Sequence, residues 1–147
     1  MVKVGFLGTG LMGQPLMGPV GTAAATKLAL NQLIAALTAG FALSLGFVQR
    51  QGVDVDKFME LLRDSALYAP TFDKKLNRMQ EGNFAAPNFP LKHLLKDINL
   101  FLSEAKAEGL EASSLAGVRQ VVEKAKDAGL ADEDYSSLYL GINQTLS

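Results

Sequence analysis

Residues 28–48 read LALNQLIAALTAGFALSLGFV, a stretch without a single charged side chain. Pro19 suits the first turn of a helix and Gly52 suits its end, so we predict one helix from Val20 to about Gln51. At 1.5 Å per residue this helix would be about 48 Å long, which exceeds the width of a compact domain of this size. It is apolar on nearly every side, so a second surface must cover it. We therefore expect a homodimer or a larger homo-oligomer.

The same stretch is also close in length to the ~20 apolar residues that span a bilayer. Four polar residues interrupt it, and no aromatic belt flanks it: Asn31, Gln32, Thr38 and Ser44. We therefore expect a helix that is buried in a helical assembly, and no membrane partner.

The composition is typical of one globular domain. The chain has 147 residues, of which 48% are hydrophobic and 20% charged, enough to form a core. A net charge of −1 predicts no nucleic-acid partner. The chain has no cysteine and a single histidine, His93, so no disulfide and no metal site are expected. The opening MVKVGFLG is unlike a signal peptide, and we expect a cytoplasmic protein.

The N-terminus carries a different pattern. Val2–Leu7 predicts a short buried strand, and the sequence GTGLMG follows it directly at 8–13. This G-x-G-x-x-G order gives a tight turn at Gly8, bare backbone for a pyrophosphate at Gly10 and close packing at Gly13. Prolines then interrupt the pattern, and no second strand–helix unit follows.

One strand cannot form a parallel sheet. We therefore interpret residues 1–16 as the remnant of a dinucleotide-binding (Rossmann) domain and residues 17–147 as an all-helical domain. The predicted fold class is all-α, a helical bundle built on one long central helix.

Four shorter helices are expected after the long one, each with its own start and stop signals. They run from the cap Asp54 to about Asp64, from Pro70 to near Gly82, from Leu91 to Glu108 with Gly109 as the stop, and from Ser113 or Ser114 to about Ala128. A last helix is predicted to begin at the cap Asp132.

Lys27 and Asn31 are four residues apart and share a helix face. Lys27 is the last charge before the apolar stretch, so partial desolvation could make it a proton donor. The alternative is a lysine that extends from the edge of a buried helix into solvent. Lys96 and Asp97 interrupt an otherwise apolar helix, so one of them lies near its core face. The alternative to a functional role is that they form a solvated charged group with Lys92.

Two aromatic side chains lie close to the predicted start of the helix at Leu91. Phe89, just before Pro90, is interpreted as a hydrophobic staple. His93 is interpreted as a surface or interface residue.

Three segments, in order, resemble the β-hydroxyacid dehydrogenase family, which includes 3-hydroxyisobutyrate dehydrogenase and the glyoxylate/succinic semialdehyde reductases. Residues 4–15 are similar to the family's cofactor loop. Residues 18–31 are similar to its glycine-rich entry followed by K-x-x-x-N, and residues 89–100 to its F-x-x-x-x-x-x-K-D segment. The resemblance implies that the helical domain is like the C-terminal domain of 6-phosphogluconate dehydrogenase.

The resemblance also implies roles for individual residues. Lys27 would be the catalytic lysine, which protonates the carbonyl oxygen as hydride arrives, and Asn31 would orient the substrate. Phe89 and Lys96 would contact cofactor or substrate, and Asp97 would hold Lys96 in place. The implied cofactor is NADP or NAD, and the implied substrate is a small hydroxy acid or aldehyde acid. The implied cofactor loop contains Gly8, Gly10, Leu11, Met12 and Gly13.

The sequence also departs from the family. The serine-glycine-glycine substrate segment and the residues that choose between NAD and NADP are missing. Positioning two reactants together accounts for about 7–11 kcal/mol of a barrier. We therefore expect a truncated NAD(P)-dependent oxidoreductase that is weakly active or inactive alone. The alternative is a non-catalytic helical self-association domain.

Overall fold

A computed structural model describes residues 21–146. Within that range the chain forms α-helices and no β-strand, so the all-α prediction is confirmed. The elements are α1 (Thr22–Arg50), α2 (Val55–Arg63), α3 (Pro70–Glu81), α4 (Leu91–Ala107), α5 (Ser113–Ala125), the π-helical turn η3 (Lys126–Leu130), the 3₁₀ turn η4 (Tyr135–Ser137) and α6 (Leu138–Asn143). The predicted strand at Val2–Leu7 and the glycine-rich loop at 8–13 lie outside the described residues.

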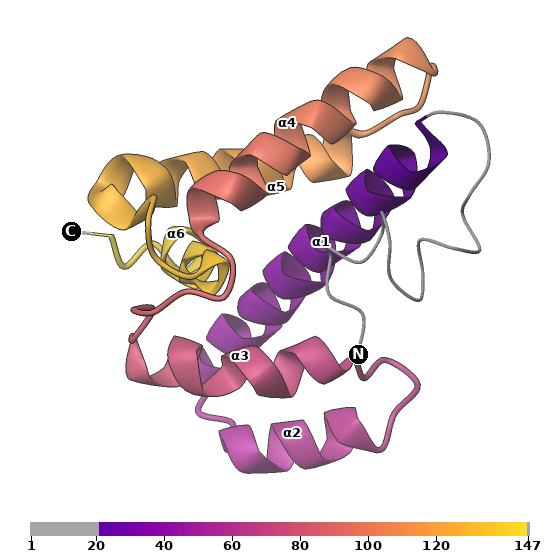
Figure 1. Cartoon of the computed structure of the whole chain (residues 1–147). Coiled ribbons are helices and arrows are strands. Elements are labelled where there is room, and N and C mark those ends of the chain that lie inside the picture. The colour runs from indigo at the N-terminus through magenta and orange to yellow at the C-terminus, as the bar shows by residue number, and fades with distance from the viewer. Residues whose placement is uncertain (1–20, 147) are drawn as a thin grey trace.

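Helix α1 is the centre of the fold. It contains 29 residues, so it is about 44 Å long, and it contacts every other α-helix. Figure 1 shows α4, α5 and α6 beside it, while α2 and α3 lie together near its C-terminal end. Its buried residues recur at helical spacing on one side: Asn31, Ala35, Thr38, Ala39, Phe41, Ala42, Leu45 and Gly46. The prediction of one long central helix is therefore confirmed.

The other side of α1 is apolar but open. Leu33, Leu37, Leu43 and Phe47 are 49%, 40%, 63% and 63% exposed. In the described part of the chain, α1 is the one helix that is long and apolar enough to cross a membrane, and 39% of its most apolar window is buried. A core helix of a soluble protein can be equally long and apolar. The expected absence of a membrane partner thus stays a prediction.

Most of the predicted helix boundaries after α1 are confirmed. The Asp54 carboxylate accepts a hydrogen bond from the Lys57 backbone N–H at 2.9 Å and caps α2. Pro70 is the first residue of α3. Gly82 and Gly109, which follow α3 and α4, have positive φ angles of 65° and 72°, a conformation that favours glycine at a helix end.

The predicted cap of α5 was wrong. Ser113 is the first helical residue, Ala112 occupies the cap position, and no side chain caps the helix. The Glu111 carboxylate instead accepts a hydrogen bond from the Ser113 backbone N–H at 2.9 Å. An acidic side chain two residues upstream therefore binds the backbone N–H of the first helical residue, and neither serine hydroxyl acts as the cap.

The predicted cap of the last helical segment was also wrong. Asp134, not Asp132, caps it, and the Asp134 carboxylate accepts the Ser136 backbone N–H at 3.1 Å. Asp132 forms an exposed ion pair with Lys92 at 2.5 Å. Both aspartates are suitable caps by residue type, and the tertiary pairing of Asp134 with Lys75 selects between them.

Helix α6 is attached to the end of α1 through a close contact at Gly46. A Cβ atom at Gly46 would lie 1.8 Å from Asn143 Oδ1, so only glycine fits without movement. The Arg50 guanidinium donates to the Asn143 backbone carbonyl at 2.7 Å, and Asn143 Nδ2 donates to the Tyr139 carbonyl at 2.9 Å. The missing side chain at Gly46 therefore lets the two helices approach each other.

We predict that Gly46→Ala lowers the free energy of unfolding by about 1–3 kcal/mol, because overpacking forces Asn143 to move. Gly40→Ala is the matched control. The same helix carries Gly40, and a Cβ there meets nothing within 4 Å. Removing a mid-helix glycine should therefore leave stability unchanged or raise it by about 0.5–1 kcal/mol. Because the open side of α1 is expected to contact a second copy, urea unfolding of both variants is measured at a protein concentration where the chain is monomeric. Equal midpoints would contradict the close contact at Gly46.

Candidate active site

The K-x-x-x-N and K-D segments meet through one side-chain hydrogen bond. Asn31 of α1 donates its Nδ2 to Asp97 Oδ2 of α4 at 2.6 Å, across 66 residues of sequence. Asn31 is 1% exposed and Asp97 is half-buried. A hydrogen bond to a charged acceptor contributes about 1.5–3 kcal/mol. This bond therefore fixes α1 against α4 at the candidate site.

The amide of Asn31 keeps one free acceptor. Its Oδ1 is buried and has no hydrogen-bond partner among the described residues. A buried acceptor without a partner costs about 1–3 kcal/mol. Such an atom is a natural contact for a ligand that brings a hydroxyl or an N–H group.

Lys27 lies one helical turn before Asn31. It is exposed, and it makes no hydrogen bond or ion pair within the described range. The expected partial desolvation of Lys27 is thus not seen in residues 21–146. The helical spacing still places its ammonium on the same face as Asn31, where it is free to contact a ligand.

The side chains of Lys96 and Asp97 have different surroundings, although the two residues are adjacent in the chain. Lys96 is exposed and lines an open hollow with Lys92, Asn99 and Lys126. The resemblance implied that Asp97 holds Lys96, but the described hydrogen bond of Asp97 goes to Asn31. Successive residues on a helix point about 100° apart, so Lys96 and Asp97 lie on different faces of α4.

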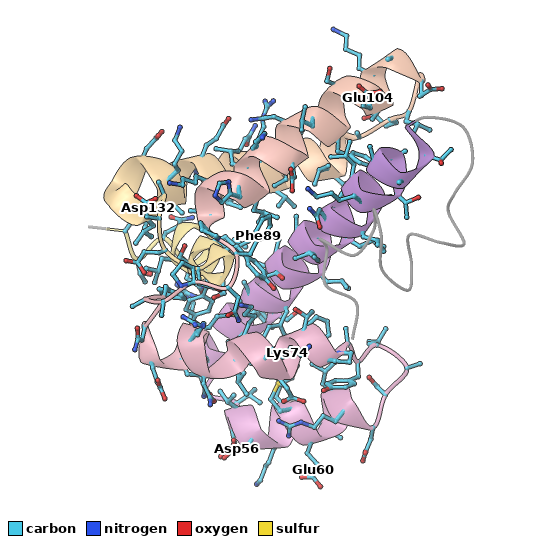
Figure 2. The ribbon with its side chains drawn as sticks, viewed as in Figure 1. Asp56, Glu60, Lys74, Phe89, Glu104 and Asp132 are labelled. Carbon is cyan, nitrogen blue, oxygen red and sulfur yellow. The ribbon has the colours of Figure 1, made fainter. Side chains whose placement is uncertain are left out.

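Phe89 and His93 extend the Asp97 face toward the start of α4. The Phe89 and His93 rings are stacked, with centroids 6.3 Å apart and planes 18° apart. His93 and Asp97 are four residues apart on α4, so they share one face, and Phe89, which precedes the helix, joins that face through its ring contact with His93. We call these three residues the Asp97 stripe. Figure 2 labels Phe89 at the start of α4, at the opposite end from Glu104.

Sequence reasoning placed His93 on the surface and did not include it in the site. It is exposed, but its contact with Phe89 puts it on the Asp97 stripe. The four-residue spacing between His93 and Asp97 on one predicted helix was the signal that could have found it.

The described residues fit only part of a dinucleotide. They provide a free ammonium, an unpaired buried amide oxygen and an aromatic surface. They contain no glycine-rich phosphate loop, since Gly8, Gly10, Leu11, Met12 and Gly13 lie outside residues 21–146. The described part of the chain also holds no group of three or more acidic or histidine side chains that could bind a metal. The arrangement suits the carbonyl end of a hydride transfer.

Residues 21–141 match the family described as the NAD-binding domain of NADP-dependent 3-hydroxyisobutyrate dehydrogenase. The chain belongs to this family. The family match covers both of the segments that Asn31 and Asp97 join.

Curated relatives agree with this assignment. Glyoxylate/succinic semialdehyde reductase 2 of Arabidopsis thaliana is 32% identical over 122 residues, which are 83% of this chain and 34% of the relative. Reductase 1 of the same plant is 29% identical over 122 residues, which are 42% of its length. The chain therefore spans well under half of the length of these relatives.

A solved structure shows the same fold. The 3-hydroxyisobutyrate dehydrogenase of Salmonella typhimurium superposes with a TM-score of 0.73 at 20% identity, over 81% of this chain and 41% of that one. At this identity the likeness supports the helical fold and not a shared substrate.

Proposed function

We propose that this chain supplies the helical half of an NAD(P)-dependent oxidoreductase that interconverts a small hydroxy acid and its carbonyl form. The contact between Asn31 and Asp97 carries the proposal, because it joins at one place the two helical segments that resemble the family's motifs. Lys27, one turn away and unpaired among the described residues, is the proton carrier.

The proposed chemistry is a balanced transfer of hydride and proton. A bound nicotinamide would supply the hydride to the carbonyl carbon, or accept it in the reverse direction. During reduction the Lys27 ammonium donates a proton to the carbonyl oxygen, and the product is the hydroxy acid. During oxidation the neutral Lys27 amine takes the hydroxyl proton. In the reduction direction the charge of the Lys27 ammonium also attracts the carboxylate of the substrate.

Asn31 and Asp97 orient the substrate in this proposal. Asp97 accepts the Asn31 amide N–H, which fixes the amide and leaves Oδ1 available for the substrate. Fixed partners of this kind place the reacting atoms before the reaction begins. We propose that the chain alone turns over slowly, because no second strand–helix unit follows the glycine-rich loop at 8–13 in the sequence to complete a cofactor domain.

A chimera tests the role of Lys27. In this chimera, residues 21–146 replace the helical domain of the Arabidopsis glyoxylate/succinic semialdehyde reductase 2. The reduction of glyoxylate or succinic semialdehyde is measured as the consumption of NADPH or NADH. We expect an active chimera, and a loss of about 10²–10⁴-fold in kcat for Lys27→Ala, the usual contribution of a general acid. Lys106→Ala, at an exposed lysine of α4, is the control and should keep full activity. A Lys27→Ala chimera as active as this control would contradict the proposal, as would ordinary turnover by the 147-residue chain alone.

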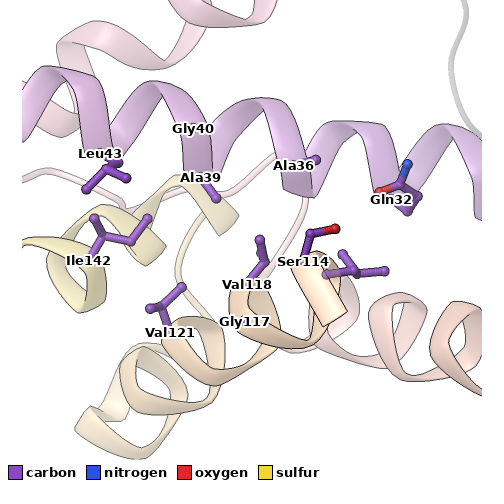
Figure 3. Close-up of a pocket in the computed structure, with 11 residues that line it drawn as sticks. Gln32, Ala36, Ala39, Gly40, Leu43, Ser114, Gly117, Val118, Val121 and Ile142 are labelled. Atoms are coloured by element: carbon purple, nitrogen blue, oxygen red, sulfur yellow. The ribbon is translucent and has the colours of Figure 1, made fainter. Parts of the chain in front are cut away.

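We also propose that two copies associate through the open side of α1. The exposed Leu43 lines a groove of about 530 Å³ between α1, α5 and α6, and small residues such as Gly40 and Gly117 are also in its lining. Figure 3 shows this groove with Leu43 and Ile142 at one end and Gln32 toward the other. Projecting side chains and a shallow groove on one surface suit a two-fold contact, in which each copy covers the other.

Light scattering tests this association. The chain should be a dimer at micromolar concentration, and Leu43→Lys should make it monomeric, because a charge would be buried at the contact. Leu61→Lys, at a 74% exposed leucine of α2, is the control and should stay dimeric. A stable monomer of the unmodified chain would contradict the proposal.

A further inference from the structure

The chain buries an ion pair that takes no part in the proposed reaction. Lys75 of α3 and Asp134 are 5% and 0% exposed. The Lys75 Nζ donates to both Asp134 carboxylate oxygens, at 3.0 and 2.9 Å. The same carboxylate accepts the Ser136 hydroxyl at 2.6 Å and the Asn88 backbone N–H at 3.3 Å. One carboxylate therefore joins α3, the loop before α4 and the η4 turn.

Backbone hydrogen bonds hold the same loop against the Asp134 segment. The Asp134 N–H donates to the Phe84 carbonyl at 2.8 Å, and the Tyr135 N–H donates to the Phe89 carbonyl at 2.9 Å. At the start of α4 the Leu91 N–H donates to the Glu133 carbonyl at 2.8 Å. The residues around Asp134 thus fix both ends of the loop that carries Phe89.

Side chains continue this connection to the site. The Lys75 Nζ lies 4.4 Å from the centre of the Tyr135 ring, within the range of a cation–π contact. The Tyr135 ring meets Phe89 edge to face, with centroids 6.0 Å apart, and Phe89 stacks on His93. An unbroken series of contacts therefore leads from the buried cation to the aromatic end of the Asp97 stripe.

We propose that Lys75 and Asp134 are positioning residues, which hold the Phe89 ring in place at the candidate active site. The proposal rests on the proposed function in so far as Phe89 borders that site. A buried ion pair often adds little stability compared with an apolar pair of similar size. What this pair provides is a carboxylate that binds three segments at once and a cation that holds the Tyr135 ring.

The charge state of Asp134 agrees with this role. Burial raises the pKa of its carboxyl, but hydrogen bonds from Ser136 and Lys75 outweigh burial and hold the pKa below its ordinary value. The carboxylate therefore stays ionised at neutral pH, where it can accept all of its bonds.

The test uses His93, the single histidine of the 147-residue chain, as a reporter. The Phe89 ring stacked on His93 shifts the NMR signals of the imidazole protons, and Phe89→Leu gives the position of those signals without the ring. We expect Lys75→Met/Asp134→Asn to move the His93 signals more than half of the way to the Phe89→Leu position. Asparagine keeps one oxygen that can accept the Ser136 hydroxyl and N–H, but an amide nitrogen replaces the oxygen that accepts the Asn88 N–H at 3.3 Å. The change therefore removes the ion pair together with that one long hydrogen bond.

A second ion pair, between α2 and α3, provides the matched control. Arg63 and Asp73 pair at 2.6 Å on the surface, and Arg63→Met/Asp73→Asn makes the same kind of change at an exposed site. It should leave the His93 signals in place. If the buried double variant only lowers the melting temperature and the His93 signals stay fixed, the pair is merely structural and the proposal is overturned.

Tyr135→Leu keeps the ion pair but removes the ring between Lys75 and Phe89. It should move the His93 signals in the same direction, and unmoved signals would overturn the proposal even if the double variant does not fold. The measurement involves no turnover. A failure here therefore leaves the proposed role of Lys27 standing, and a failure of the Lys27 experiment leaves this result unchanged.

Discussion

A buried amide must find partners inside the protein, and Asn31 finds its partner on another helix. Water cannot reach it, so the Asp97 carboxylate takes the N–H group at 2.6 Å. This requirement fixes where α4 lies along α1. It also places the free amide oxygen of Asn31 and the ammonium of Lys27 on one face. The geometry of the candidate site thus follows from the satisfaction of one polar side chain.

The two roles that we propose for the long helix lie on different faces of it. One side carries small and apolar residues that α3, α4, α5 and α6 cover, with Asn31 and Thr38 as the polar residues among them. The opposite side keeps leucines and Phe47 exposed, which is the surface that we propose to cover with a second copy. Catalytic and assembly surfaces on one rigid helix would be mechanically linked, since neither can shift without the other.

The sequence predicted the elements well because their signals are local. The uncharged run of α1, the cap Asp54, the opening Pro70 and the stop glycines each act within a few residues. The choice between Asp132 and Asp134 as a cap depended on Lys75, which is 59 residues from Asp134, so local reasoning could not make it. The pairing of Asp97 with Asn31 rather than Lys96 depended on helix packing in the same way.

The sequence predicted which residues belong to the candidate site, but it did not predict most of the contacts between them. Lys27 and Asn31 follow from helical spacing, and the family resemblance added Phe89, Lys96 and Asp97. The stacking of Phe89 on His93 and the buried ion pair behind it were not predicted, because each needs the loop between α3 and α4 in its folded position. Hydrophobic periodicity predicts helices, but it cannot predict polar contacts between residues that are far apart in the sequence.

A double-mutant cycle between Asn31→Ala and Asp97→Ala tests the central contact most directly. The free energies of unfolding of the two single variants and the double variant give the coupling between the side chains. We predict a coupling of about 1.5–3 kcal/mol, the value for a hydrogen bond to a charged acceptor. A coupling within about 0.5 kcal/mol of zero, the limit for independent sites, would show that the two motifs are not joined and would contradict this account.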